Sequence, residues 1–345
     1  MPPPPPLPPL PELEELQHLI AQGGGWLQSR VVCEVKVGPE RLPVWAIGLG
    51  NPAPGLPALG VIGGVHGLER IGAEVVLAWL RSLVMRLRWD ETLHRQLEQM
   101  RIVLMPLVNP GGLRLGTRAN PQGVDLMRNA PVDSDEAGPW LVGGHRIGPG
   151  LPWYRGPLGA AMQPEAQALC EVVRSELLER PFSLVVDCHS GFGLHDRLWF
   201  PFAHTARPMP QLAALHALGE VLDQSLPYHP YILEPQSRQY RAHGDLWDHL
   251  VLAAPQGNVF LPLTLEMGSW LWVKKNPRQL FSRLGLFNPL IGHRQQRVLR
   301  RHLMWLDFAS RLAASPARWL PEGAARVQHQ EAALTRWYRT APRGG

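Results

Sequence analysis

A histidine and a glutamate lie three positions apart in a glycine-rich stretch, residues 63–69 (GGVHGLE). A strand-like apolar run, residues 59–65, leads into this stretch, and apolar residues at helical spacing follow it from residue 71 to 87. Where a strand gives way to a helix, an imidazole and a carboxylate at this spacing can reach one point in space. His66 and Glu69 are therefore candidate ligands of a single metal ion.

Three further polar residues occur at the ends of strand-like runs. Asn109 follows one apolar run, His189 follows a second, and Glu266 ends a third. Strands that alternate with helices predict a largely parallel sheet covered by helices on both faces. Ligands of such sheets bind beyond the carboxyl ends of the strands. We therefore expect one pocket to collect these residues together with the His66–Glu69 pair.

His66, Glu69 and His189 together would form a site with two histidines and one carboxylate. Three protein ligands leave the fourth position of a zinc ion open for water, which is typical of catalytic zinc. Bound zinc lowers the pKa of water to about 7 and polarises a carbonyl oxygen. Glu266 is then the natural general base and proton donor. The structural alternatives are a salt-bridged strand-end carboxylate for Glu266 and a hydrogen-bonded core imidazole for His189.

The remaining sequence predicts a mixed, largely parallel α/β fold with helices on both faces of the sheet. Strands are expected over residues 30–37, 42–49, 59–65, 102–108, 183–188 and 261–266, and helices over residues 11–22, 71–87, 91–100, 164–180, 211–225 and 299–314. The long Gly-, Pro- and Asn-rich stretch from residue 109 to 159 is typical of a functional loop. We expect three regions: a proline-rich tail with a short helix (1–25), a catalytic domain (26–315) and a C-terminal tail (316–345).

Composition and charge argue against several classes of protein. The net charge is +5, with 34 Lys and Arg against 29 Asp and Glu, and the sequence contains no basic run typical of nucleic-acid binding. No apolar run reaches the roughly 18 residues of a membrane span, and no secretory signal is visible at the N-terminus. The three scattered cysteines do not suggest a disulfide framework. We expect a cytoplasmic protein without nucleic-acid or membrane partners.

Several ordered motifs carry a resemblance to a known family. They are HGLE at 66–69, NPGG at 109–112, TRANPQGVDLMRN at 117–129, DCHS at 187–190 and TLE at 264–266. Their order is similar to that of the zinc metallocarboxypeptidases of the carboxypeptidase A type, and the likeness extends over roughly residues 30–310. The separations fit as well, with 120 residues from Glu69 to His189 and 77 from His189 to Glu266.

The resemblance implies a role for each matching residue. His66, Glu69 and His189 would hold one zinc ion per chain, and Glu266 would act as general base and later as proton donor. The other implied roles are polarisation of the scissile carbonyl by Arg118, binding of the substrate's free carboxylate by Arg128, and closure over the substrate by Tyr240. The implied reaction removes a C-terminal residue from a peptide or peptide-like substrate, by attack of metal-bound water on the amide carbonyl.

One position departs from the family pattern. The family usually has asparagine immediately before the carboxylate-binding arginine, where this chain has Met127. A hydrogen-bond donor to the substrate carboxylate is therefore missing. Asn129 is a candidate substrate-binding residue nearby, although a residue one step further along an extended chain points elsewhere.

Two alternatives to a carboxypeptidase remain open. The first is an N-acyl amino acid deacylase of the aspartoacylase or succinylglutamate desuccinylase type, which shares the opening motif; the long stretch before the third ligand favours the carboxypeptidase. The second is a non-catalytic relative that binds a peptide end, for which Met127 is the supporting feature. For a carboxypeptidase, a bacterial cell-wall peptide and an ordinary C-terminal amino acid are both possible substrates. The oligomeric state is left open by the sequence.

Overall fold

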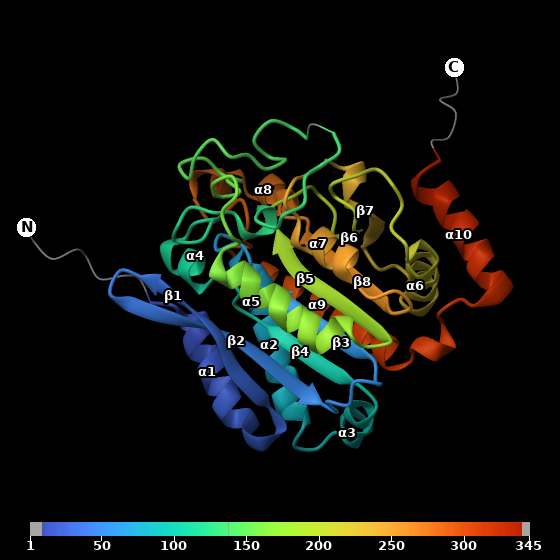
Figure 1. Ribbon diagram of the computed structural model, residues 1–345. Helices are drawn as coiled ribbons and strands as arrows, with labels where there is room; N and C mark the ends of the chain where they lie inside the picture. The colour runs from blue at the N-terminus through green and yellow to red at the C-terminus, as the bar shows by residue number, and fades with distance from the viewer. Residues whose placement is uncertain (1–8, 137, 340–345) are drawn as a thin grey trace, which may run out of the picture.

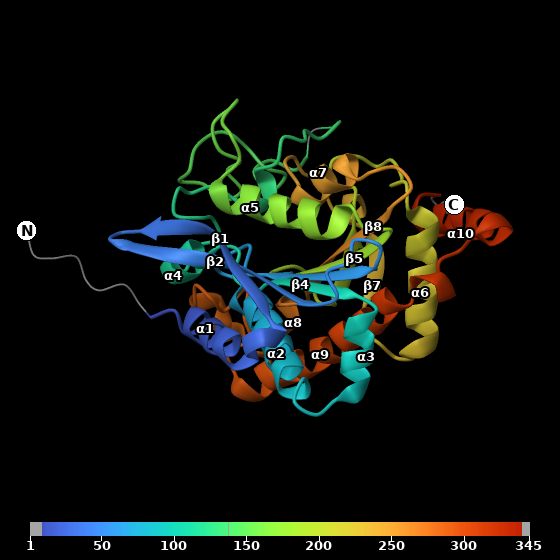
Figure 2. The same ribbon diagram turned by 60° about the horizontal axis from the view of Figure 1, so that its bottom comes forward.

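The computed structural model describes residues 9–136 and 138–339 and contains one eight-stranded sheet with helices on both faces (Figures 1 and 2). The strand order is β1-β2-β4-β3-β5-β8-β6-β7. Pairing is parallel from β4 through β3 and β5 to β8 and between β6 and β7, and antiparallel elsewhere. The strands are β1 (Gln28–Val37), β2 (Glu40–Gly50), β3 (Ala58–Gly63), β4 (Arg101–Met105), β5 (Phe182–Ser190), β6 (Arg197–Phe200), β7 (Ile232–Pro235) and β8 (Val259–Met267).

The helices form a layer on each side of this sheet, as the turned view shows (Figure 2). The layer with α2 and α9 contacts β3 and β5, and the opposite layer with α5 and α7 contacts β1 and β8. The helices are α1 (Pro11–Gly23), α2 (Arg70–Arg86), α3 (Glu91–Glu98), α4 (Pro110–Leu115), α5 (Pro164–Val173), α6 (Leu212–Ser225), α7 (Leu246–Ala253), α8 (Trp270–Lys275), α9 (Gly292–Ala314) and α10 (Gly323–Trp337). The predicted mixed, largely parallel fold with helices on both faces is therefore confirmed.

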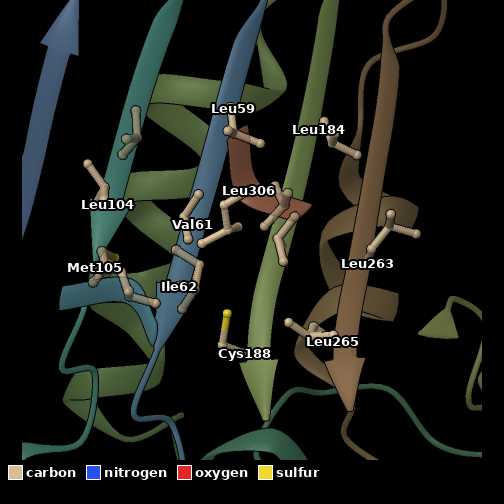
Figure 3. Packing of buried hydrophobic residues seen from close by; sticks show 14 of the residues in the cluster. Leu59, Val61, Ile62, Leu104, Met105, Leu184, Cys188, Leu263, Leu265 and Leu306 are labelled. Carbon is tan, nitrogen blue, oxygen red and sulfur yellow. The ribbon is translucent and has the colours of Figure 1, made fainter. Parts of the chain in front are cut away.

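The core lies between the central strands and the helices that cover them. Figure 3 shows apolar side chains from β4, β3, β5 and β8 packed side by side with Leu306 of α9. Every residue of β3, β4 and β5 is buried. Because both faces of these strands are covered, their sequences are continuous apolar runs, which is why the strands were visible in the sequence.

The packed structure extends beyond the limits expected for the catalytic domain. Helix α1 places Leu13, Leu16 and Leu19 in the same apolar core, and α1 contacts α2. At the other end, α10 contacts α6 and buries Ala333 and Trp337. The predicted short helix over residues 11–22 is present as α1, but residues 11–25 and 316–339 are packed against the domain, which the sequence had limited to residues 26–315. Most of the proline run lies outside the described residues.

The two shortest strands, β6 and β7, were not anticipated from the sequence. Each has four residues. None of the helices in the described ranges is long and apolar enough to cross a membrane.

Candidate metal centre and active site

The candidate site lies at the carboxyl ends of β3, β5 and β8. The strand register pairs His189 of β5 with Glu266 of β8, and paired residues of neighbouring strands project from the same face of a sheet. His66 follows the end of β3 through a turn in which Gly64 has a φ of 65°. A side chain at Gly67 would bring its Cβ within 2.0 Å of the backbone carbon of Gly112. Glycine at this position therefore allows the loop that carries His66 to pack against α4.

His66, Glu69 and His189 converge, as the sequence predicted. The Nδ1 atoms of the two histidines are 3.3 Å apart. Glu69 places Oε1 2.9 Å from His66 Nδ1 and Oε2 3.1 Å from His189 Nδ1. All three side chains are buried. One Nδ1 atom from each imidazole and one carboxylate therefore face a single point.

Each imidazole is oriented from behind by an aspartate. His66 Nε2 lies 3.0 Å from Asp125 Oδ1, and His189 Nε2 lies 2.7 Å from Asp187 Oδ2. A carboxylate can only accept hydrogen bonds, so each Nε2 carries the proton and each Nδ1 can present a lone pair to a cation. Asp187 is itself fixed by the Trp247 indole, which donates to Oδ2 at 2.8 Å.

Arg118 connects the two carboxylates on the His66 side of the site. It donates from Nε to Asp125 Oδ2 at 2.8 Å and from Nη1 to Glu69 Oε1 at 3.1 Å. Burial alone would raise the pKa of Asp125, but the neighbouring Arg118 guanidinium and His66 hold that pKa well below its ordinary value. For Glu69, burial is again opposed by the two histidines, and the net result is a lowered pKa. Both carboxylates are therefore held in the charged form, which favours a cation between the imidazoles.

Glu266 lies in a different environment from Glu69. Burial, reinforced by the negative charge of Glu69, raises the pKa of Glu266 to about 8, although His189 and Arg118 act in the opposite direction. Two carboxylates of one site thus differ in their affinity for a proton, which is the usual arrangement when one is a ligand and the other transfers protons.

A cavity of about 490 Å³ opens beside these groups. Arg128 and Met127 line it, and Arg128 is only 2% exposed. Arg128 Nη1 donates to the Met127 carbonyl at 3.2 Å and Nη2 donates to the Tyr240 hydroxyl at 3.2 Å, while Nε has no hydrogen-bond partner within the described residues. A buried guanidinium that keeps an unpaired donor is suited to a carboxylate ligand.

Aromatic side chains form one wall of this cavity. The Tyr240 ring lies 5.9 Å from the Trp199 ring and 6.1 Å from the Phe192 ring, between centroids, and all three line the cavity. Arg128 lies 5.8 Å from the centre of the Tyr240 ring. Tyr240, which the resemblance suggested, is thus placed at the cavity against the carboxylate-binding candidate.

Two residues expected near the site lie elsewhere. The Asn129 amide donates to the Arg155 carbonyl at 2.9 Å and accepts from the Gln163 backbone, and Asn129 does not line the cavity. Asn109 caps α4 by accepting from the Gly112 backbone at 2.7 Å. Both side chains are committed to the backbone of the long loop region, so they position the loops and do not reach the cavity.

The sequence reasoning missed the two aspartates behind the metal-ligand candidates. Asp187 precedes His189 by two positions, and residues two apart on a strand project from the same face, so this partner could have been found from the strand alone. Asp125 sits in a loop 59 residues from His66. Only the fold brings that pair together.

The donor set fits zinc. Two neutral imidazoles and one carboxylate, each imidazole held by a carboxylate from behind, are the donors and supporting groups of catalytic zinc sites. Within the described ranges, the only other group of this kind is formed by His216, Glu220 and His329, on α6 and α10.

Comparison with known proteins identifies the family. Residues 34–257 match the sequence model of the family described as zinc carboxypeptidase, which is more than half of the chain. The chain therefore belongs to the zinc carboxypeptidase family. It is 24% identical to carboxypeptidase D of Anas platyrhynchos over 197 residues, which are 53% of this chain and 12% of that protein. It is 32% identical to carboxypeptidase SOL1 of Arabidopsis thaliana over 93 residues, 26% of this chain and 19% of that protein. The chain thus matches less than a fifth of the length of either relative.

Solved structures share the fold. A structure of thrombin-activatable fibrinolysis inhibitor superimposes with a TM-score of 0.62 at 15% identity and covers 88% of this chain and 74% of its own. Carboxypeptidase A from Helicoverpa armigera gives a TM-score of 0.60 at 15% identity and covers 88% and 72%. The bovine form of the first protein, in complex with tick carboxypeptidase inhibitor, gives a TM-score of 0.59 at 15% identity and covers 94% of this chain and 97% of its own.

Proposed function

We propose that this protein is a zinc-dependent peptidase that removes the C-terminal residue of a peptide or peptide-like substrate. The observation that carries the proposal is the convergence of His66, Glu69 and His189, with Glu266 beside them, in one cavity. Membership of the zinc carboxypeptidase family supports it. These three residues would hold the ion, which when bound acidifies water and polarises a carbonyl oxygen.

Glu266 is the group that moves protons in this proposal. It lines the cavity, and the strand register places it beside His189. A cation held by the three ligand candidates would lower the pKa of Glu266 again and favour its charged form. In that form it takes a proton from the attacking water and delivers it to the leaving amine, so one carboxylate serves both half-reactions. Arg118 also lines the cavity and stabilises negative charge as it develops on the carbonyl oxygen.

Arg128 is the group that selects a chain terminus. Its guanidinium reaches the cavity next to the Tyr240 hydroxyl, with an Nε–H that has no hydrogen-bond partner among residues 9–136 and 138–339. A planar fork of donors pairs with both oxygens of a carboxylate, which a lysine ammonium cannot do. The substrate's free carboxylate would bind here and place the last amide bond toward Glu266.

The decisive experiment compares zinc content and turnover in wild type, Glu266→Gln and His189→Ala. Peptides with a free C-terminus, the same peptides with an amidated C-terminus, and small N-acyl amino acids are offered to each preparation. We expect wild type to cleave only the free-acid peptides. Glu266→Gln should keep its zinc and lose about 10²- to 10⁴-fold in kcat, whereas His189→Ala should lose zinc and turnover together.

The alternatives give different results in the same assay. Preferential cleavage of N-acyl amino acids would indicate a deacylase, and zinc content without turnover on any substrate would indicate a binding protein. Full activity in Glu266→Gln would remove this residue from the mechanism.

A further inference from the structure

A second group of two histidines and one glutamate lies on other elements, between α6 and α10. His216 and Glu220 belong to α6, and His329 belongs to α10. The two helices lie side by side at one edge of the molecule in both ribbon views (Figures 1 and 2) and contact each other. None of the three residues lines the active-site cavity.

The three side chains lie close enough together to hold one metal ion. His216 Nδ1 and His329 Nδ1 are 3.0 Å apart, and the Glu220 carboxylate oxygens lie 3.8 and 3.9 Å from these two atoms. Ligands of tetrahedral zinc, at bond lengths of about 2.1 Å, are separated by roughly 3.4 Å. The corresponding distances among His66, Glu69 and His189 are 3.3, 2.9 and 3.1 Å. The Glu220 oxygens would have to move about 0.5 Å closer to the two histidines to reach the spacing of tetrahedral zinc ligands, and the Glu220 side chain is exposed.

The local structure favours convergence of the three side chains. His216 and Glu220 are four residues apart on a helix, so they lie on one face about one turn apart. His216 is buried and its ring contacts the Trp337 ring at 5.9 Å between centroids, while the Glu220 side chain is 47% exposed. His216 would therefore be a fixed ligand, whereas the exposed Glu220 side chain can adjust its position and can be reached by an ion from solvent.

The surrounding charges do not prevent cation binding. Arg336 is the nearby basic residue, and its Nη1 lies 3.9 Å from Asp223 Oδ2 on α6. The Asp223 carboxylate therefore offsets part of the repulsion between Arg336 and a bound cation.

We propose that His216, Glu220 and His329 bind a divalent transition-metal ion, with zinc as the probe ion, and that this ion clamps α10 onto α6. Helix α10 buries Ala333 and Trp337 among its described residues, and the Trp337 indole donates to the Leu233 carbonyl at 3.0 Å. A bridging ion would add a further attachment to α6, because binding to the folded arrangement alone stabilises that arrangement. Imidazole and carboxylate donors suit zinc and also copper and nickel. The remaining coordination position would be open to water. Because the group lies on α6 and α10 and not at the active-site cavity, its ion would act on the packing of these helices independently of the catalytic ion.

The test uses the full chain after removal of metal with a chelator and addition of zinc alone. Bound zinc per chain and the hydrogen exchange of α10 amides are measured in wild type, Glu220→Gln and His329→Gln. Wild type should bind about two equivalents, and zinc at about ten times its dissociation constant should slow α10 exchange about tenfold. Each variant should bind one equivalent less, and its α10 exchange should be independent of zinc.

Two matched variants serve as controls. Glu331→Gln changes an exposed glutamate of α10, and His293→Gln changes an exposed histidine of α9; both should behave as wild type. Because Glu220 is exposed, its substitution keeps the packing of α6 and α10 and tests the site even where His329→Gln disturbs it. Equal zinc binding by wild type and both site variants, or α10 exchange that ignores zinc, would overturn the proposal.

Discussion

At the scale of single residues, the site depends on how each metal-ligand candidate is held from behind. His189 presents Nδ1 to the other ligands because its Nε2 is tied to Asp187 at 2.7 Å. The Trp247 indole in turn fixes Asp187. An aspartate with two such partners sets both the tautomer and the angle of the ring.

This arrangement predicts the effect of Asp187→Asn. The amide would no longer stabilise a proton on Nε2, so zinc affinity should fall about 10- to 100-fold with the fold intact. A competition titration with a zinc-binding dye measures it. Asp307→Asn is the matched control, because Asp307 also accepts from a buried tryptophan, Trp79, but touches none of the ligand candidates. Equal affinities in Asp187→Asn and wild type would contradict the role given to Asp187.

Met127 provides a second prediction at this scale. Its side chain lines the cavity next to Arg128, where the family usually offers an asparagine. Met127→Asn would add a hydrogen-bond donor for the substrate carboxylate, worth about 1 kcal/mol or roughly fivefold in kcat/KM. We expect this gain for free-acid peptides and not for amidated ones. Met127→Leu, which changes shape without adding a donor, should leave the ratio of the two substrates as in wild type; a gain in both variants would show that packing and not hydrogen bonding is responsible.

At the scale of elements, α1 is part of the fold although the sequence suggested a tail. Leu16 is fully buried, and Glu12 is ion-paired with Arg70 of α2 at 2.5 Å. The proline run before the helix and the three glycines after it favoured a domain limit at residue 26, behind the helix. The buried leucines, three and six positions apart, are the signal that indicates otherwise.

Leu16→Ala tests whether this helix stabilises the domain. Removing a fully buried leucine leaves a cavity and should lower the free energy of unfolding by about 2–5 kcal/mol. Urea unfolding followed by tryptophan fluorescence measures the change. Gln17→Ala, at an exposed position of the same helix, should change stability by less than about 0.5 kcal/mol. A Leu16→Ala protein as stable as wild type would mean that α1 adds nothing to the cooperative unit.

The predicted elements were those with strong apolar patterns. The strands β3, β4, β5 and β8 are covered on both faces and could be recognised as continuous apolar runs. The edge strands β6 and β7 are four residues long, too short for their pattern to stand out from a loop. Asn109 was predicted to follow a strand directly, but β4 ends at Met105 and the Asn109 side chain caps α4, a role that asparagine at the start of a helix commonly has.

At the scale of the whole molecule, the sequence could locate the site because its residues follow parallel strands that end at the same edge of the sheet. The ends of β3, β5 and β8 are neighbours in the sheet, so residues 66, 69, 189 and 266 converge once the parallel sheet is assumed. Loop residues do not follow from this rule. Asp125 reaches His66, and Asn129 turns away toward Arg155, through the path of a long loop that only the folded chain defines.

The stability of the molecule should depend on pH through a histidine remote from the cavity. His302 of α9 is fully buried, and its Nδ1 lies 3.0 Å from the Tyr231 hydroxyl. Asp196 favours a charged ring, but its carboxylate is 3.9 Å away and is already paired with Arg301 at 2.7 Å. Burial therefore dominates and lowers the pKa of His302 from 6.5 to about 4.

A lowered pKa makes the folded state less able than the unfolded chain to take up a proton. Above pH 6.5 the ring is neutral in both states and contributes no pH dependence. Between pH 6.5 and about 4 only the unfolded chain becomes protonated, so the free energy of unfolding falls as the pH falls. Between pH 8 and pH 5, this residue should lower the free energy of unfolding by about 2 kcal/mol.

Urea unfolding of wild type and His302→Gln across this pH range, in the presence of a chelator, isolates the effect. The variant also changes packing, but a packing change shifts the difference between the two proteins equally at every pH. The free energy of unfolding of wild type minus that of His302→Gln should therefore decline by about 2 kcal/mol between pH 8 and pH 5. The same difference taken with His293→Gln, at an exposed position, should stay constant. A difference for His302→Gln that is flat with pH would mean that the ring gains a proton in the folded state as readily as in the unfolded chain, and that Asp196 outweighs burial.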